Sequence, residues 1–300
     1  MTIPSYIPHM PAADKPRLPH IDTTNLPRLA TTVPHGQATE HIEQAWGVTL
    51  TPHPAIEEHK ARIAKLRAYY TEHSRAERDF AAVTHTDAKN FDKRLKEVAA
   101  NRAKYPFTDN EIEAELRKLD GELLHIRDRA DYHEHILNQL DIDTVADNFV
   151  DAVQQLGEDA FDIAKAAQRN PEATHTLQVE GRKLALLKNL FDQTSQRRPE
   201  AALYISLDNV PQLTATEERR NRAVFNNEDH ITTHKLLKQA VRQIDNLDLF
   251  LIHAAAGTYP HTTLDVATTY TEYNRRRAQI DQLGTVTITR LDGTIETRNI

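Results

Sequence analysis

The strongest constraint on the fold is a run of nine positions in the second third of the chain, which follow an unbroken four-three spacing. The nine are Ile112, Leu116, Leu119, Leu123, Ile126, Ala130, His133, Leu137 and Leu140. Alternating steps of four and three residues keep side chains on one stripe of a helix, which is the pattern of a coiled-coil seam. We therefore expect this segment to lie lengthwise against a partner helix and to bury the stripe.

The segment from residue 55 to 105 carries a second helical pattern. Its positions spaced by seven are Ile56, Ile63, Tyr70, Glu77, Thr84, Phe91, Val98 and Tyr105. The polar side chains of Glu77 and Thr84 interrupt the middle of this stripe, and Thr86 can serve as a new helix N-cap. One long helix fits the pattern, but two helices with a bend near residues 84–86 are favoured.

Signals for a helix end and a helix start separate the two patterns. Pro106 ends the first, and Thr108-Asp-Asn-Glu111 has the form of a capping box that starts the next helix. A helix from about residue 109 to 140 would then run back over the preceding one and bury its leucines against Phe80, Phe91, Leu95 and Val98. The sequence thus predicts an antiparallel coiled-coil hairpin over residues 55–140, although a parallel homodimer would satisfy the same heptads.

The composition favours an elongated helical protein over one large compact core. Of the 300 residues 39% are hydrophobic and 27% are charged, which suits helices that share narrow seams. The apolar run from Leu247 to Ala256 is interrupted by Asp248 and His253 and is far shorter than the roughly 20 residues of a membrane span. With no cysteine, disulfides, thiolate nucleophiles and Cys-type zinc sites are excluded. The net charge of -7 argues against wholesale nucleic-acid binding.

The first 54 residues are dominated by proline, with nine of the fourteen prolines at 4, 8, 11, 16, 19, 27, 34, 52 and 54. Because proline fixes its own φ and disfavours helix in the residue before it, we expect residues 1–54 to form an extended arm and not a helix. The arm also carries apolar residues. It could lie along another surface or be a disordered leader. Its start does not resemble a secretory signal, so the expected location is cytoplasmic.

Residues 141–260 have the pattern of a helical body with shorter elements. One-sided apolar stripes predict helices at about 144–156, 158–169, 172–192, 215–225 and 229–256. The short apolar run Ala201–Leu207 is equally consistent with a strand and with a buried helical turn.

Residues 261–300 combine a last helix, at about 263–283, with a change to period two. Val286 and Ile288 alternate with threonines, Asp292-Gly293 supplies a turn, and a second strand containing Ile295 follows. A lone two-stranded ribbon is marginal in water, so this β-hairpin should rest on a helix or join strands from another chain. We regard it as the best candidate for a docking element; a hairpin that caps its own bundle is the alternative.

Candidate chemistry is sparse. His230 and His234 lie one helical turn apart, as in zinc proteases, but Ile231 stands where those enzymes need glutamate and no third ligand is evident. No Gly-x-Ser-x-Gly elbow or phosphate-binding glycine loop is present. The basic clusters are Arg182-Lys183, Arg197-Arg198, Arg219-Arg220-Asn-Arg222 and Arg275-Arg276-Arg277, and they indicate a solvated face or a phosphate contact.

The sequence therefore predicts a mainly α, elongated protein with a non-enzymatic structural or assembly role. Such a chain suits a subunit of an oligomer or particle, for example a phage-type virion or assembly component located within the virion. The alternatives are a metal-dependent helical enzyme using His230 and His234, and a nucleic-acid-associated adaptor. Protein partners, including further copies of the chain, are expected; a membrane, nucleic acid and a cofactor are not. The expected contact residues are Ile112, Leu116, Leu119, Leu123, Ile126, His133, Leu137, Leu140, Val286, Ile288 and Ile295.

Overall fold

The chain is mainly helical and forms two compact units. The computed structural model describes residues 17–30, 33–34, 37–85, 89–127, 129–191, 201–217, 223–225, 228–242 and 246–299. One unit is Thr51–Tyr132, and the other combines Met1–Leu50 with His133–Ile300.

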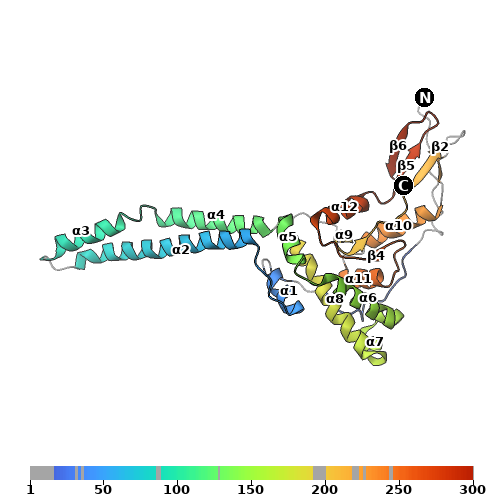
Figure 1. Ribbon diagram of the computed structural model, residues 1–300, viewed down its shortest axis with the longest axis horizontal. Coiled ribbons are helices and arrows are strands. Elements are labelled where there is room, and N and C mark those ends of the chain that lie inside the picture. The colour runs from blue at the N-terminus through green and yellow to red at the C-terminus, as the bar shows by residue number, and fades with distance from the viewer. Residues whose placement is uncertain are drawn as a thin grey trace. The chain divides into compact units, whose positions relative to one another are not determined.

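The unit Thr51–Tyr132 is an antiparallel helical hairpin (Figure 1). One arm is the continuous helix α2 (Pro54–Ala81), followed by a 3₁₀ turn, η2 (Ala82–His85). The other arm consists of α3 (Phe91–Arg102) and α4 (Asp109–Arg127), which follow one another back along α2. The expected break near residues 84–86 is confirmed, and it is here that the chain reverses.

The position of this reversal corrects one expectation. We expected the chain to reverse at Pro106, so that α4 would run back over the segment before it. Instead α3, which precedes Pro106, and α4 both lie against α2. The capping box is confirmed: the Glu111 carboxylate accepts the Thr108 N–H at 2.8 Å, and Thr108 Oγ1 accepts the Glu111 N–H at 3.3 Å. This box restarts the helix without turning the chain around.

Paired contacts fix the antiparallel register of the hairpin. Glu77 of α2 forms an ion pair with Arg102 at 2.6 Å, and the His73 Nδ1 lies 3.1 Å from the Asp109 carboxylate. Towards the start of α2, His59 Nε2 is 2.7 Å from the carbonyl oxygen of Leu119. Residue numbers fall on one arm as they rise on the other. The predicted seam residues of α4 therefore pack within the chain: Ile112 and Leu119 are buried, and Leu116, Leu123 and Ile126 are half-buried.

The expected single helix over residues 109–140 is wrong. Helix α4 ends at Arg127 and a separate helix, α5 (Ala130–Leu137), follows. The seam's smallest residue, Ala130, and its polar member, His133, lie close to this break, so the stripe offers little apolar area to hold one helix together here. His133, Leu137 and Leu140 are buried in the other unit and do not extend the hairpin seam.

Packed helices form the core of the second unit. Its central pair is α6 (Ile142–Leu156) and α8 (Pro171–Phe191), joined by a 3₁₀ turn, η3 (Gly157–Phe161), and by α7 (Ile163–Arg169). The predicted end of α6 at Gly157 is confirmed. The expected helix over 229–256 is instead two helices, α10 (Glu228–Arg242) and α11 (Leu247–Ala255). Residues 201–207 begin as α9 (Ala201–Tyr204) and continue as the short strand β1 (Ile205–Ser206), which pairs with β4 (Thr263–Leu264).

The described part of the proline-rich segment lies on this helical core. Leu29 is fully buried, and the Asp248 carboxylate accepts the N–H groups of Leu29 and Ala30 at 3.2 and 2.7 Å. A Cβ on Gly181 of α8 would stand 2.8 Å from the Phe149 ring and 2.9 Å from the Leu29 side chain, so a larger residue here would force these side chains to shift. Residues 17–30 thus lie along a surface of their own chain; residues 1–16 are outside the described residues.

One part of the expected arm is a helix. Helix α1 (Ala38–Trp46) lies between Pro34 and Pro52, in the stretch of the first 54 residues that contains no proline. It ends at Gly47, whose φ of 66° is left-handed. The expectation of an arm without helix is therefore wrong for residues 38–46.

A four-stranded sheet and the helix α12 (Tyr270–Asp281) complete this unit. The strands are β2 (Thr214–Glu217), β3 (Ala223–Phe225), β5 (Thr285–Thr289) and β6 (Ile295–Asn299), in the order β3-β2-β5-β6. The predicted hairpin of β5 and β6 is confirmed. The expected helix over 215–225 is wrong, because Thr214-Ala-Thr-Glu217 alternates with period two and pairs in parallel with β5. Helix α12 also begins later than the expected residue 263.

Candidate functional site: the C-terminal sheet

One face of the four-stranded sheet is covered by its own chain. Residues of β2 and β5 pack there against α10 in a buried cluster formed by Leu213, Ala215, Ile231, Val286 and Ile288. Val286 and Ile288 were expected to contact a partner. Because β5 is an inner strand between β2 and β6, these two side chains are core residues, which corrects that expectation.

The opposite face of the sheet is lined by threonines. Alternate residues of a strand point to opposite faces, so the neighbours of the buried residues form this side. They are Thr214, Thr216, Thr285, Thr287, Thr289 and Thr297. The register places Thr214, Thr287 and Thr297 side by side across three strands. β-Branched threonine suits a pleated surface that stays partly exposed to water.

Strand β6 forms an open edge of this sheet. The Arg290 N–H donates to the Thr294 carbonyl at 2.8 Å, which makes these two residues the first hydrogen-bonded pair of the hairpin. Hydrogen-bonded and non-bonded pairs alternate along an antiparallel ladder, so Glu296 and Arg298 also direct their backbone groups towards β5. Ile295, Thr297 and Asn299 direct theirs outwards, and within the described part of the chain no strand pairs with that side of β6.

Charged side chains of the same strand lie on the face of the sheet that carries Val286 and Ile288, their partners across the pair. The Glu296 carboxylate accepts hydrogen bonds from Arg298 and from Arg290, the latter through Nε at 2.8 Å. These two guanidinium groups, Arg298 more than Arg290, lower the pKa of Glu296 to about 2. Glu296 therefore stays ionised across the physiological pH range.

Two apolar side chains are exposed beside this edge. Leu291 in the hairpin turn is 67% exposed and Ile295 at the start of β6 is 72% exposed. These two side chains lie beside the outward-facing backbone groups of β6 and make this edge a candidate contact surface. Of the three hairpin residues predicted as contacts, Ile295 is the one that remains available.

His234 of α10 joins the segments that lead into β2 and β5. Its Nδ1 accepts the Gly284 N–H at 3.1 Å, so its proton resides on Nε2, which donates to the Pro211 carbonyl at 2.8 Å. This arrangement leaves His234 without a nitrogen for a metal ion. His230, one turn earlier, is half-buried. No group of three or more histidine, aspartate or glutamate side chains that could hold a metal ion occurs among the described residues.

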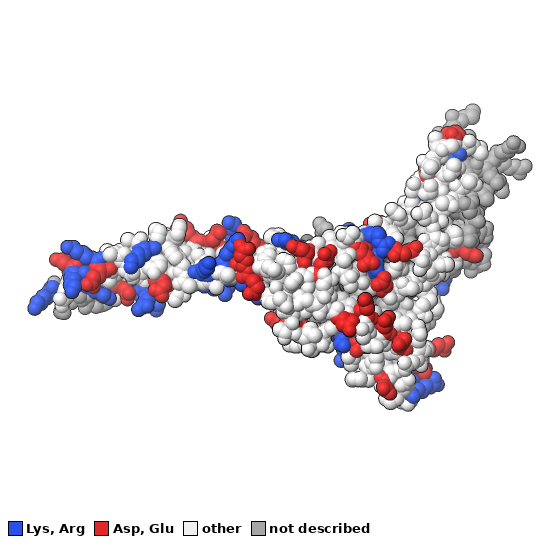
Figure 2. All heavy atoms as spheres, viewed as in Figure 1, with Lys and Arg blue, Asp and Glu red and all other residues white. Residues whose placement is uncertain are grey.

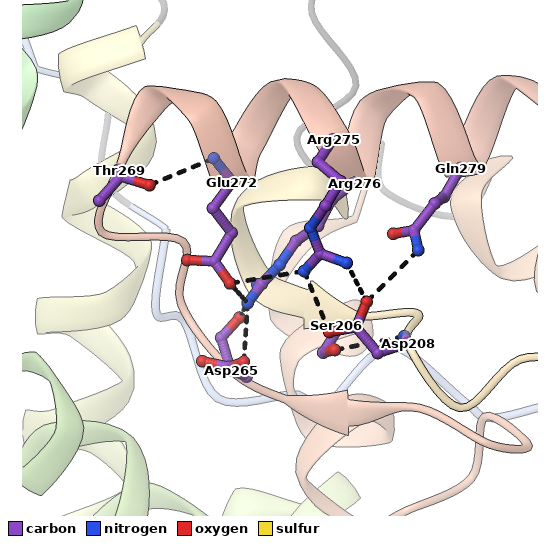
Figure 3. Close-up of polar contacts among 8 residues, drawn as sticks. All are labelled: Ser206, Asp208, Asp265, Thr269, Glu272, Arg275, Arg276 and Gln279. Atoms are coloured by element: carbon purple, nitrogen blue, oxygen red, sulfur yellow. Dashed lines mark hydrogen bonds and ion pairs between the residues drawn. The ribbon is translucent and has the colours of Figure 1, made fainter.

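A polar cluster on α12 also connects the segments that lead into β2 and β5 (Figure 3). Arg275 forms a two-point ion pair with Asp208, and the Gln279 amide donates to the same carboxylate at 3.3 Å. The hydrogen bonds from Arg275 hold the pKa of Asp208 well below its usual range. The cluster thus ties the chain ahead of β2 to the helix ahead of β5.

Arg276 is the buried member of this cluster. Its guanidinium is fully buried and contacts the carboxylates of Asp265 at 2.7 Å and Glu272 at 2.6 Å (Figure 3). Thr269 caps α12 by accepting the Glu272 N–H at 3.2 Å. Two acids around one buried guanidinium provide the pairing that such a charge needs.

A polar cleft of about 470 Å³ lies between this cluster and the threonine face. Its lining includes Asp208, His234, Gln279 and Thr287. The two groups here that could exchange protons, Asp208 and His234, are held by Arg275 and by main-chain atoms. The cleft therefore has a polar lining, as a binding surface would, but its carboxylate, Asp208, and its imidazole, His234, are engaged in contacts that stabilise the fold.

The basic clusters do not form one positive surface in the described residues. Arg275 and Arg276 are held in the ion pairs above, and Lys183 pairs with Glu180 at 3.0 Å. Residues 192–200 and 218–222, which hold two of the clusters, are outside the described residues. Along the hairpin unit, Figure 2 shows basic and acidic side chains interspersed. This mixture is typical of a solvated face.

Sequence reasoning identified the hairpin but missed the sheet that contains it. The sequence did contain a signal for it, the alternation Thr-x-Thr, which occurs in Thr214–Thr216 as well as in Thr285–Thr289.

No helix among the described residues combines the length and the apolar character needed to cross a bilayer. Comparison with family models, curated proteins and solved structures found no match to this chain.

Proposed function

We propose that this chain is a non-enzymatic structural protein that joins an oligomer or particle, such as a phage-type virion or an assembly intermediate, through the open edge of its C-terminal sheet. The observation that carries the proposal is strand β6, where Ile295, Thr297 and Asn299 direct their backbone groups away from the sheet. An exposed sheet edge is a template for a strand from another protein.

The composition of β6 supports this role. Natural proteins protect sheet edges with charged side chains, proline, bulges or a covering segment. Strand β6 contains no proline, and its two charges, Glu296 and Arg298, neutralise each other. Exposed Leu291 and Ile295 add apolar area beside the edge.

The competing enzyme and nucleic-acid hypotheses receive less support. A metal enzyme would need His234 to release its bonds to Pro211 and Gly284. A phosphate-binding surface built on Arg275 and Arg276 would need them to leave Asp208, Asp265 and Glu272. Both changes would dismantle the contacts that position the sheet.

Sedimentation velocity of the full chain from micromolar to millimolar concentration tests the proposal, together with metal analysis of the same sample. We expect a reversible increase in mass and no stoichiometric metal. The variant Thr297→Pro removes an outward N–H without removing a bond to β5, so it should weaken association. A chain that stays monomeric at every concentration would contradict the proposed function, and stoichiometric zinc or iron in it would favour the metal-enzyme alternative.

A further inference from the structure

Strand β6 has a sequence that is complementary to itself when two copies run antiparallel. In such a pair, centred on Thr297, residue 296 faces residue 298 of the other strand, and residue 295 faces residue 299. Glu296 thus meets Arg298 twice, once on each side of the two-fold axis. Opposite charges directly across from each other stabilise an antiparallel pair.

The backbone geometry selects the same arrangement. Residues with outward-facing backbone groups must meet each other for hydrogen bonds to form between two edges. A pair centred on Thr297 places Thr297 opposite itself and Ile295 opposite Asn299, and these are the three residues whose backbone groups point outwards. Every outward N–H and C=O of β6 would therefore find a partner.

The neighbouring registers are disfavoured by charge. Sliding one strand by two residues keeps the outward groups in contact, but it brings either Glu296 opposite Glu296 or Arg298 opposite Arg298. Like charges at directly facing positions destabilise a strand pair. The charges therefore distinguish one register from the two nearest alternatives.

The faces of the sheet would also continue across the axis. Side chains of facing residues lie on the same side of an antiparallel pair, so Thr297 would meet Thr297 on the threonine face. The row of facing threonines formed by Thr214, Thr287 and Thr297 would therefore continue, across the axis, into the same row of the second copy.

We propose that the partner at this edge is a second copy of the chain, with β6 paired antiparallel to β6 about a two-fold axis at Thr297. The two four-stranded sheets then form one continuous eight-stranded sheet through an isologous contact. This inference rests on the proposed function, because it names the partner and the register of the assembly contact.

A mixing experiment with two charge variants tests the register. Glu296→Lys leaves two basic residues on its β6, and Arg298→Glu leaves two acidic residues on its β6. Each variant alone would face itself with like charges, and we expect its dimer dissociation constant to rise by at least about tenfold. An equimolar mixture would pair basic with acidic strands at both positions, so we expect heterodimers, detectable by native mass spectrometry.

Controls separate this inference from folding defects and from the proposed function. Circular dichroism checks that each variant is folded, and Thr297→Pro should prevent dimers without changing any charge. Oligomers that survive in both charge variants but are lost in Thr297→Pro would overturn the register and leave assembly through the β6 edge intact. A wild-type chain that is monomeric at every concentration would overturn both. Homodimers of the single variants as tight as the heterodimer would also overturn the register.

Discussion

His234 donates a hydrogen bond to the carbonyl oxygen of Pro211, 2.8 Å away, and thereby fixes α10 to the segment that leads into β2. Its other ring nitrogen accepts the N–H of Gly284, just ahead of β5. The imidazole thus sets the distance between the starts of two parallel strands. A side chain that resembled half of a metal site in the sequence holds the sheet in place.

We predict that His234→Ala lowers the free energy of unfolding by about 2–3 kcal/mol, because it removes two hydrogen bonds and leaves the buried N–H of Gly284 and the partly buried carbonyl of Pro211 unpaired. Urea denaturation followed by circular dichroism measures this. His230→Ala, one turn earlier in the same helix and half-buried, is the matched control and should cost clearly less. Equal losses in the two variants would contradict the role given to His234.

Acid should weaken the β5–β6 hairpin through Glu296. Its pKa is depressed from 4.5 to about 2 in the folded chain, first by Arg298 and then by Arg290. A depressed carboxylate pKa contributes stability above pH 4.5, and this contribution is lost as the pH falls from 4.5 towards 2. The melting temperatures of the wild type and of Glu296→Gln should therefore differ at neutral pH and converge in acid. A constant difference at all pH values would show that ionisation is not the cause.

Asp248 should control the attachment of residues 17–30. Asp248→Ala removes the acceptor of two N–H groups, those of Leu29 and Ala30, and we expect tryptic cleavage after Arg28 to become several-fold faster. Time-resolved mass spectrometry of the digest measures the rate. Cleavage at the wild-type rate would mean that other contacts hold this segment, such as the burial of Leu29 and the hydrogen bond from the Ile163 N–H to the Asn25 carbonyl at 2.9 Å.

The hairpin seam can be tested within one helix. Leu119 is buried against α2, whereas Leu124 on α4 is 41% exposed. We expect Leu119→Ala to destabilise the hairpin by about 2–4 kcal/mol and Leu124→Ala to cost less than about 1 kcal/mol. Thermal melts recorded at the helical circular-dichroism band compare the two. Similar costs would indicate that the four-three stripe does not form the seam.

Local signals in the sequence predicted the helices well. The Thr108–Glu111 capping box, the end of α6 at Gly157 and the break after α2 depend on neighbouring residues, and each lies where the pattern placed it. On α4, where the apolar stripe is continuous, the predicted seam residues Ile112 and Leu119 are buried. The seam prediction was wrong beyond Arg127, where Ala130 and His133 bury too little apolar area to continue the helix.

Contacts between distant residues could not be predicted in the same way. The segment Thr214–Phe225 is rich in charged residues that favour helix, yet β2 forms because β5, far along the chain, pairs with it in parallel. That pairing also decides that Val286 is buried and that β6 becomes the open edge. The sequence indicated a hairpin able to dock, but its accessible strand depended on long-range packing.

The two arms of the helical hairpin are built unequally. Helix α2 passes Tyr105 and Phe107 without interruption, with Tyr69 in ring contact with both, while the opposite arm changes there from α3 to α4. A sideways load on the hairpin would therefore concentrate bending at this junction, where a single helix resists it. Under such a load, the part of the hairpin that contains α3 would tilt relative to the part that contains α4 and the start of α2 near Pro54.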